Sequence, residues 1–167
     1  VILGRDSVIN VAPATYVDAP ENWEPLPGSL EAIARLHRDG HRVVIVTHQP
    51  AVAHGALHME TLNRIHARML DLIRHKGGEV EAIFVCPHGP ESRCRCRPPL
   101  PGLFEEIAER LKINLSGVAV VAAVGRRTAR PDTFWTPVRP ALPAVLDGAG
   151  GPAIFDRRRA PRLLPRS

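Results

Sequence analysis

Three cysteines and one histidine lie close together in this chain, and their types and spacing are those of a metal site. They are Cys86, His88, Cys94 and Cys96, and the 167-residue chain has no other cysteine. Structural zinc takes four tetrahedral ligands, and three thiolates with one imidazole are one of its standard sets. The pattern therefore predicts a zinc-binding loop that holds structure and leaves no open position for substrate. One disulfide with a free thiol is the alternative for three cysteines.

Arginines accompany the ligands of this loop, at Arg93, Arg95 and Arg97. The planar guanidinium group binds phosphate well, so Arg97 is a candidate phosphate-binding residue. For Arg93 and Arg95, solvated loop charge is an equally good interpretation.

The composition is that of an ordinary globular protein, with 44% hydrophobic and 23% charged residues. No apolar run approaches the roughly 20 residues that span a bilayer, and no secretory signal is evident. We therefore expect no membrane association. Metal-type cysteine usage without a signal indicates a cytoplasmic location.

The net charge of +5 comes largely from arginines late in the chain. Such a segment suits an acidic protein partner. Few aromatic residues accompany it, which disfavours nucleic-acid binding. We expect a monomer or a subunit bound to a partner.

Four buried apolar runs predict strands, and three amphipathic stretches predict helices. The strands fall at 1–3, 42–47, 82–85 and 118–124, and the helices near 29–39, 59–75 and 102–111. Ser29 is the expected N-cap of the first helix. His66 lies on the apolar face of the second helix, where we expect a core or boundary histidine and not a ligand. Alternating strands and helices predict an α/β fold, a Rossmann-like three-layer sandwich with a mainly parallel sheet. Its ligand site should lie beyond the carboxyl ends of the strands.

The domain organisation that we predict is one domain over residues 1–167. Its part from about residue 125 is rich in proline and arginine, with an edge strand at 144–146.

Motifs at two predicted strand ends, together with the zinc loop, resemble those of haloacid-dehalogenase phosphatases. Residues 2–10 (ILGRDSVIN) resemble the Asp-x-Asp-Gly-Thr-hydrophobic-Asn opening, and residues 46–49 (VTHQ) resemble the Thr-Asn-Gln second motif. The zinc loop is similar to that of the heptose-bisphosphate and histidinol-phosphate phosphatases. The resemblance covers essentially the whole chain, although it thins after Ala123.

The resemblance implies a phosphatase mechanism in which a first aspartate attacks phosphorus and a second serves as general acid and base. A threonine and a lysine hold the phosphoryl oxygens, and acids after the last strand bind Mg²⁺. In this chain the nucleophile position is Gly4, and the acid/base position keeps Asp6. The lysine position is Pro98, and the Gly-Asp after the last strand is Ala122-Ala123.

The remaining site candidates also come from the resemblance. Thr47 and the backbone near Arg5 join Arg97 as phosphate-binding candidates, and His48 and His54 are substrate-loop candidates. Because the Mg²⁺ acids are replaced, we expect Mg²⁺ to bind poorly and structural Zn²⁺ to be the resident metal.

The function that these residues predict is that of a zinc-stabilised pseudoenzyme, a scaffold or phospho-ligand-binding domain. Removing a key catalytic group commonly costs on the order of 10⁴–10⁶ in rate. One alternative is an active sugar-phosphate phosphatase with relocated catalytic groups. Another is binding of an anionic polymer through the arginine-rich segment.

Overall fold

Four short parallel strands form the central sheet of the chain. The computed structural model describes residues 1–11 and 14–123. The strands are β1 (Ile2–Gly4), β2 (Val44–His48), β3 (Ala82–Cys86) and β4 (Val120–Val121). Their order across the sheet is β3-β2-β1-β4, with every pairing parallel. β1 therefore lies between the second and the last strand.

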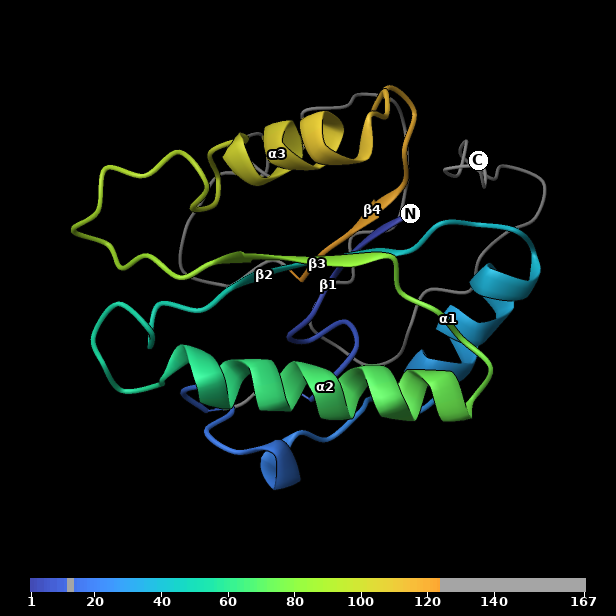
Figure 1. The fold of residues 1–167 in the computed structure, drawn as a ribbon, viewed down its shortest axis with the longest axis horizontal. Coiled ribbons are helices and arrows are strands. Elements are labelled where there is room, and N and C mark those ends of the chain that lie inside the picture. Colours follow the sequence, from blue (N-terminus) through green and yellow to red (C-terminus); the bar gives the residue numbers. More distant parts are fainter. Residues whose placement is uncertain (12–13, 124–167) are drawn as a thin grey trace.

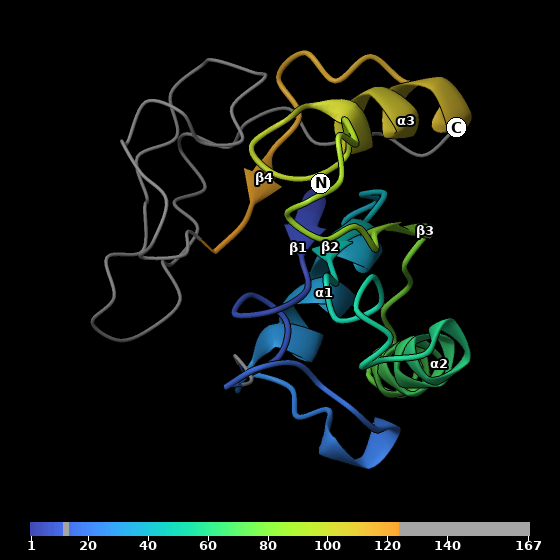
Figure 2. The ribbon, with the colours of Figure 1, turned by 90° about the vertical axis from the view of Figure 1, so that its left-hand side faces the viewer.

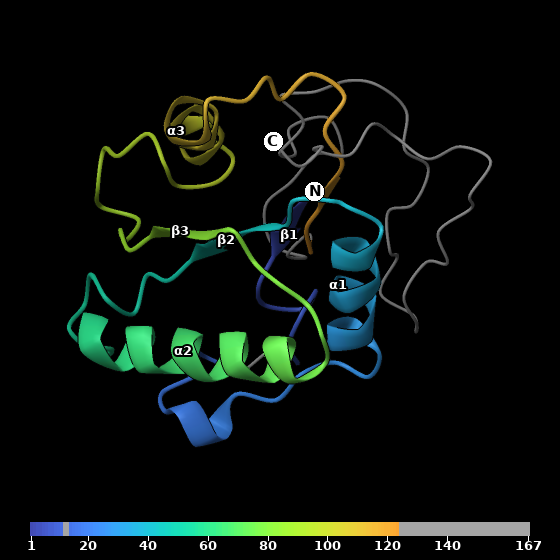
Figure 3. The same cartoon turned by 45° about the vertical axis from the view of Figure 1, so that its right-hand side comes forward.

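Helices cover both faces of this sheet, as Figures 1 and 2 show. They are α1 (Ser29–Arg38), α2 (Met59–His75) and α3 (Gly102–Leu111), with a short 3₁₀ helix, η1 (Pro20–Asn22). α1 and α2 lie on one face and α3 on the other (Figure 3). The predicted three-layer α/β sandwich is confirmed, and the α2 and α3 bounds agree with the sequence pattern.

The strands are almost wholly apolar because each of their two faces is covered. Leu3 and Ile45 belong to the core on the α1 and α2 side. Ile2 and Val44, their neighbours in sequence, belong to the core beneath α3. This alternation follows the period of two in a strand, and burial on both faces explains why polar residues enter only at the end of β2, with Thr47 and His48.

The start of α1 differs from the prediction in one respect. Gly28 is the N-cap, with φ of 80°, and Ser29 is the first helical residue. The Ser29 hydroxyl donates to the Ile9 carbonyl at 2.7 Å. The side chain that was expected to cap the helix therefore fastens it to the loop after β1.

Predictions for the C-terminal part lie partly outside the described residues. The strand predicted at 118–124 is shorter in the structure, where β4 covers only Val120–Val121. Residue 124, the edge strand at 144–146 and the arginine-rich segment lie outside the structure's description. Within the described residues, no helix has the length and apolar character needed to cross a membrane.

The junction between the cysteine-rich loop and α3 has room only for glycine. The Gly102 amide donates to the Arg95 carbonyl at 3.0 Å, and a Cβ at position 102 would lie 2.5 Å from that carbonyl oxygen. At Gly4 the nearest atoms to an added Cβ are 3.4 Å away, an ordinary contact distance.

We predict that Gly102→Ala lowers the free energy of unfolding by about 1–3 kcal/mol, the usual cost of overpacking. Gly4→Ala is the matched control, and its effect should be much smaller because the added methyl group fits. Denaturant titration of both variants measures the difference. Equal destabilisation by the two substitutions would contradict the steric argument.

Candidate functional site

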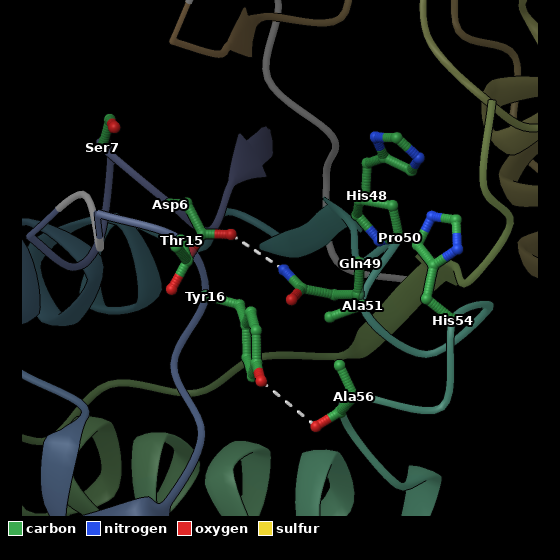
Figure 4. Close-up of a pocket in the computed structure, with 10 residues that line it drawn as sticks. All are labelled: Asp6, Ser7, Thr15, Tyr16, His48, Gln49, Pro50, Ala51, His54 and Ala56. Atoms are coloured by element: carbon green, nitrogen blue, oxygen red, sulfur yellow. Dashed lines mark hydrogen bonds between the residues drawn. The ribbon is translucent and has the colours of Figure 1, made fainter.

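A cavity of about 430 Å³ opens at the carboxyl ends of β1 and β2. This is the edge at which a parallel α/β sheet binds its ligand, as the sequence predicted. Figure 4 shows Asp6 and Tyr16 on one side of it and the segment after β2 on the other. The lining residues are Asp6, Ser7, Thr15, Tyr16, His48, Gln49, Pro50, Ala51, His54 and Ala56.

Asp6 is held on the cavity wall by an array of hydrogen bonds. Arg5 donates to it through Nε at 3.1 Å and through Nη2 at 2.9 Å and 3.1 Å. Asn10 donates to Oδ1 at 3.1 Å, and Gln49 donates to Oδ2 at 2.8 Å. Both carboxylate oxygens are thus engaged, although 30% of the side chain remains exposed.

The partner of Asp6 in this array, Arg5, is buried with 0% of its side chain exposed. Its amide donates to the Val46 carbonyl, which ties the turn after β1 to β2. Its remaining nitrogen, Nη1, lies 3.2 Å from Nε2 of the buried His66 on α2. Neither the backbone N–H nor the guanidinium of Arg5 is therefore directed to a ligand; the residue supports Asp6.

The ionisation of His66 follows from these surroundings. Arginine offers no acceptor, so Nη1 donates to Nε2, and the neutral ring carries its proton on Nδ1. Burial, followed by the Arg5 charge, lowers the pKa of His66 to about 4, against a smaller opposing effect of Asp6. The predicted core position of this histidine is confirmed.

Thr47 and Gln49 occupy the end of β2 as a buried polar pair. The Thr47 hydroxyl accepts from Gln49 Nε2 at 2.7 Å, and Thr47 does not line the cavity. The backbone N–H of Gln49 donates to the Cys86 carbonyl at 2.8 Å. Gln49 therefore links Asp6 to the first residue of the cysteine-rich loop.

The two histidines predicted for the substrate loop, His48 and His54, both line the cavity. A carbonyl oxygen only accepts, so His48 Nε2 donates to the His88 carbonyl at 2.9 Å. A Cβ added at Gly89 would lie 3.2 Å from the His54 ring, which shows how closely that ring packs. Both histidines thus contact the cysteine-rich loop.

The ligand atoms of the cysteine-rich loop converge on one point. One atom each from Cys86, His88, Cys94 and Cys96 lies within 4.8 Å of the others. The cysteines are free, so the disulfide alternative is not adopted. Desolvation, with the neighbouring thiols, raises the pKa of Cys96 to about 12, and a bound cation would replace that proton. The donor set fits a tetrahedral metal ion.

The Arg97 side chain joins the end of the cysteine-rich loop to its beginning by a hydrogen bond. Its Nη1 donates to the Gly89 carbonyl at 3.0 Å, and Arg97 is absent from the cavity lining. Arg95 pairs with Glu105 on α3 at 3.0 Å. These contacts stabilise the loop, and a phosphate contact by Arg97 stays a prediction.

The nucleophile position, Gly4, lies beside Ala122, the residue before the position at which the resemblance expects a metal-binding acid. β1 and β4 pair in parallel, and a Cβ at Gly4 would lie 3.4 Å from Ala122 Cα. Asp6 is the one carboxylate among the residues that line the cavity, and its oxygens already accept hydrogen bonds. The described residues therefore do not fit the family's Mg²⁺ site.

The sequence did not reveal Asn10 and Gln49, which donate hydrogen bonds to Asp6, or His66, which accepts one from Arg5. One available signal was polar residues directly after buried runs, as in the segment from Thr47 to Gln49. A second signal was Ser7, whose φ of 62° lies in the region that favours glycine. This position is glycine in the motif that residues 2–10 resemble.

We predict that the free energy of unfolding falls as pH decreases from about 6.5 towards 4. His66 binds a proton near pH 6.5 in the unfolded state but only near pH 4 in the folded state. Protonation between these pH values therefore stabilises the unfolded state relative to the folded state. The loss attributable to His66 should reach about 3 kcal/mol at pH 4. Denaturant titration across this range, with His66→Gln, measures it.

His66→Gln should reduce this pH slope, whereas His58→Gln, at an exposed position before α2, should leave it unchanged. A slope that persists in full in His66→Gln would show that other groups cause the pH dependence.

Comparison with known proteins places the chain among phosphatases. It is 46% identical over 121 residues to D-glycero-beta-D-manno-heptose-1,7-bisphosphate 7-phosphatase of Bordetella bronchiseptica, covering 72% of this chain and 68% of that protein. The enzyme of the same name from Neisseria meningitidis is 36% identical over 150 residues, covering 90% and 78%. No family model matches the chain.

Solved structures agree with this placement. The B. bronchiseptica D,D-heptose 1,7-bisphosphate phosphatase, complexed with magnesium and phosphate, superimposes with a TM-score of 0.70 at 46% identity, over 72% of this chain and 67% of that one. A HAD-like phosphatase from Mesorhizobium loti gives 0.66 at 31% identity, over 74% and 62%. The chain thus spans about two thirds of the length of these relatives. It belongs to the D-glycero-beta-D-manno-heptose-1,7-bisphosphate 7-phosphatase family of the haloacid-dehalogenase superfamily.

Proposed function

We propose that this chain recognises a sugar phosphate of the heptose-bisphosphate class in the cavity at the carboxyl ends of β1 and β2. The observation that carries the proposal is the 46% identity over 121 residues to a heptose-bisphosphate phosphatase. The cavity at the ligand-binding edge of the sheet supports it. Ser7, Thr15 and Tyr16 are among its lining residues and carry hydroxyl groups, of which the Tyr16 hydroxyl donates to the Ala56 carbonyl at 3.2 Å.

Hydrolysis of that sugar phosphate is the first candidate activity, and the relatives support it. Their names describe a phosphatase, and Asp6 stands at the position where the resemblance expects the acid/base. The activity would need a nucleophile other than the residue at position 4, because glycine has no side chain. His48 lines the cavity and belongs to a residue type that can attack phosphorus.

Binding without hydrolysis is the second candidate, and the residues at the edge of β1 and β4 favour it. Gly4 and Ala123 carry no carboxylate, and Pro98 carries no cation. In the family mechanism, a carboxylate attacks while a metal ion and a lysine neutralise the phosphoryl charge. Without those three groups, the cavity would hold a phosphate through hydroxyl groups and histidines. Of the two candidates, we favour this one.

The metal that we propose for Cys86, His88, Cys94 and Cys96 is zinc. Zn²⁺ suits thiolate and imidazole donors, whereas Mg²⁺ takes oxygen ligands. These four residues would bind it through Sγ atoms and one ring nitrogen. Zinc would stabilise the loop that contacts His48 and His54.

We predict that phosphate release from D-glycero-D-manno-heptose 1,7-bisphosphate is at least about 10⁴-fold slower than with the B. bronchiseptica enzyme, assayed in parallel with Mg²⁺. Calorimetry on the same samples should detect binding of the sugar phosphate. Turnover comparable to that of the relative would establish the phosphatase candidate. Absence of both turnover and binding would contradict the proposed ligand class.

Restoring the replaced groups provides a matched pair of variants for this assay. Gly4→Asp combined with Pro98→Lys and Ala123→Asp should gain Mg²⁺-dependent turnover, because a side chain fits at position 4. The same triple variant with Gly4→Asn has nearly the same volume but no nucleophile. It should stay inactive. Equal turnover by the two variants would show that position 4 is not the nucleophile position.

We predict that the purified chain contains about one Zn²⁺, and that its removal lowers the melting temperature, because metal binding and folding are coupled in such sites. Metal analysis and thermal melting before and after chelation measure this. Cys96→Ser is the control, since the chelator should change its melting temperature much less. An unchanged melting temperature after complete removal would show that the metal is dispensable.

A further inference from the structure

We propose that His66 is a positioning residue: it accepts a hydrogen bond from Arg5 and so fixes the guanidinium that holds Asp6 on the cavity wall. The three residues come from the turn after β1 and from the middle of α2, sixty-one positions away in the sequence. They form one connected path from a helix in the outer layer to the cavity.

The first step of the path is the contact between Arg5 and Asp6. Nε and Nη2 of Arg5 both donate to Oδ1, at 3.1 Å and 2.9 Å, and Nη2 also reaches Oδ2. Because this contact uses two donor atoms of a planar group, rotation of the guanidinium would move the carboxylate or break the contact. The orientation of Asp6 therefore depends on that of Arg5.

The second step is the contact between Arg5 and His66. The Arg5 side chain is fully buried, so water does not compete for Nη1. Among the described residues, Nη1 donates to His66 Nε2 at 3.2 Å. A buried donor without an acceptor is costly, so loss of the imidazole would favour a different guanidinium orientation.

The consequence for the cavity follows from where each residue lies. Asp6 lines the cavity, whereas Arg5 and His66 do not. His66 would therefore affect a ligand only through Arg5 and Asp6. The ligand-binding part of the test rests on the proposed function, but the geometric part does not.

The test compares His66→Leu, which has no acceptor, with His66→Gln, whose amide oxygen can accept from Arg5. Ile73→Val, a fully buried change on the same helix, is the control for altered α2 packing. In NMR spectra, we expect the Arg5 Nε–H resonance to be protected from solvent exchange in wild type, His66→Gln and Ile73→Val, and to lose protection in His66→Leu. Affinity for D-glycero-D-manno-heptose 1,7-bisphosphate should fall about tenfold in His66→Leu alone.

A protected Arg5 Nε–H in a folded His66→Leu variant would overturn the proposal. If that variant does not fold, ¹⁵N shifts of His66 in the wild-type protein decide, because a proton on Nε2 instead of Nδ1 would exclude the bond from Arg5. If wild type does not bind the sugar phosphate, the proposed function fails, but the Arg5 and His66 resonances still decide the positioning role.

Discussion

Burial of the Arg5 guanidinium is the interaction on which the arrangement of the site depends. A charged group can be taken out of water only when it is paired and its donors are satisfied. Arg5 meets this requirement with Asp6 and His66, and its amide pairs with β2. The requirement therefore joins the turn after β1 to α2 and to the end of β2. Asn10 and Gln49 then complete the hydrogen bonds of Asp6.

The cysteine-rich loop contributes a second set of constraints from the other side of the cavity. The His48 ring donates to the carbonyl of His88, and the backbone N–H of Gln49 donates to the carbonyl of Cys86. Both carbonyls belong to residues of the cluster that could hold a metal ion. Gln49 also donates to Asp6. The cluster is thus connected to the cavity wall through backbone groups, whose positions depend on the path of the loop and not on side-chain rotamers.

The fold was largely predictable from sequence because its elements follow strong hydrophobic patterns. The period of α2 placed His66 on the buried face, and the apolar runs located the strands. The cluster of Cys86, His88, Cys94 and Cys96 was equally evident because these four candidate ligands are close in sequence. The start of α1 was misassigned because the partner of Ser29, the carbonyl of Ile9, lies twenty residues earlier.

The partners of Asp6 show why part of the site escaped prediction. Arg5 was expected to present its backbone to a phosphate, but its amide pairs with Val46 and its side chain turns into the core. That outcome depends on His66, which only the packing of α2 against the sheet brings near. Periodicity predicts which face of a helix is buried, but not which polar group that face will contact.

The chain has the fold of its family, and Gly4, Pro98 and Ala123 stand where the resemblance expects charged catalytic groups. A nucleophile and metal-binding acids at positions 4 and 123 would contribute little apolar burial, and an added Cβ at Gly4 meets its neighbours only at ordinary contact distances. Gly4 and Ala123 leave these two positions without a charged side chain. By contrast, Arg5, Asp6 and His66 depend on one another, since removing any one leaves a buried polar group unpaired. The contacts among these three residues therefore contribute to stability whether or not the chain catalyses turnover, and the family resemblance does not by itself establish turnover.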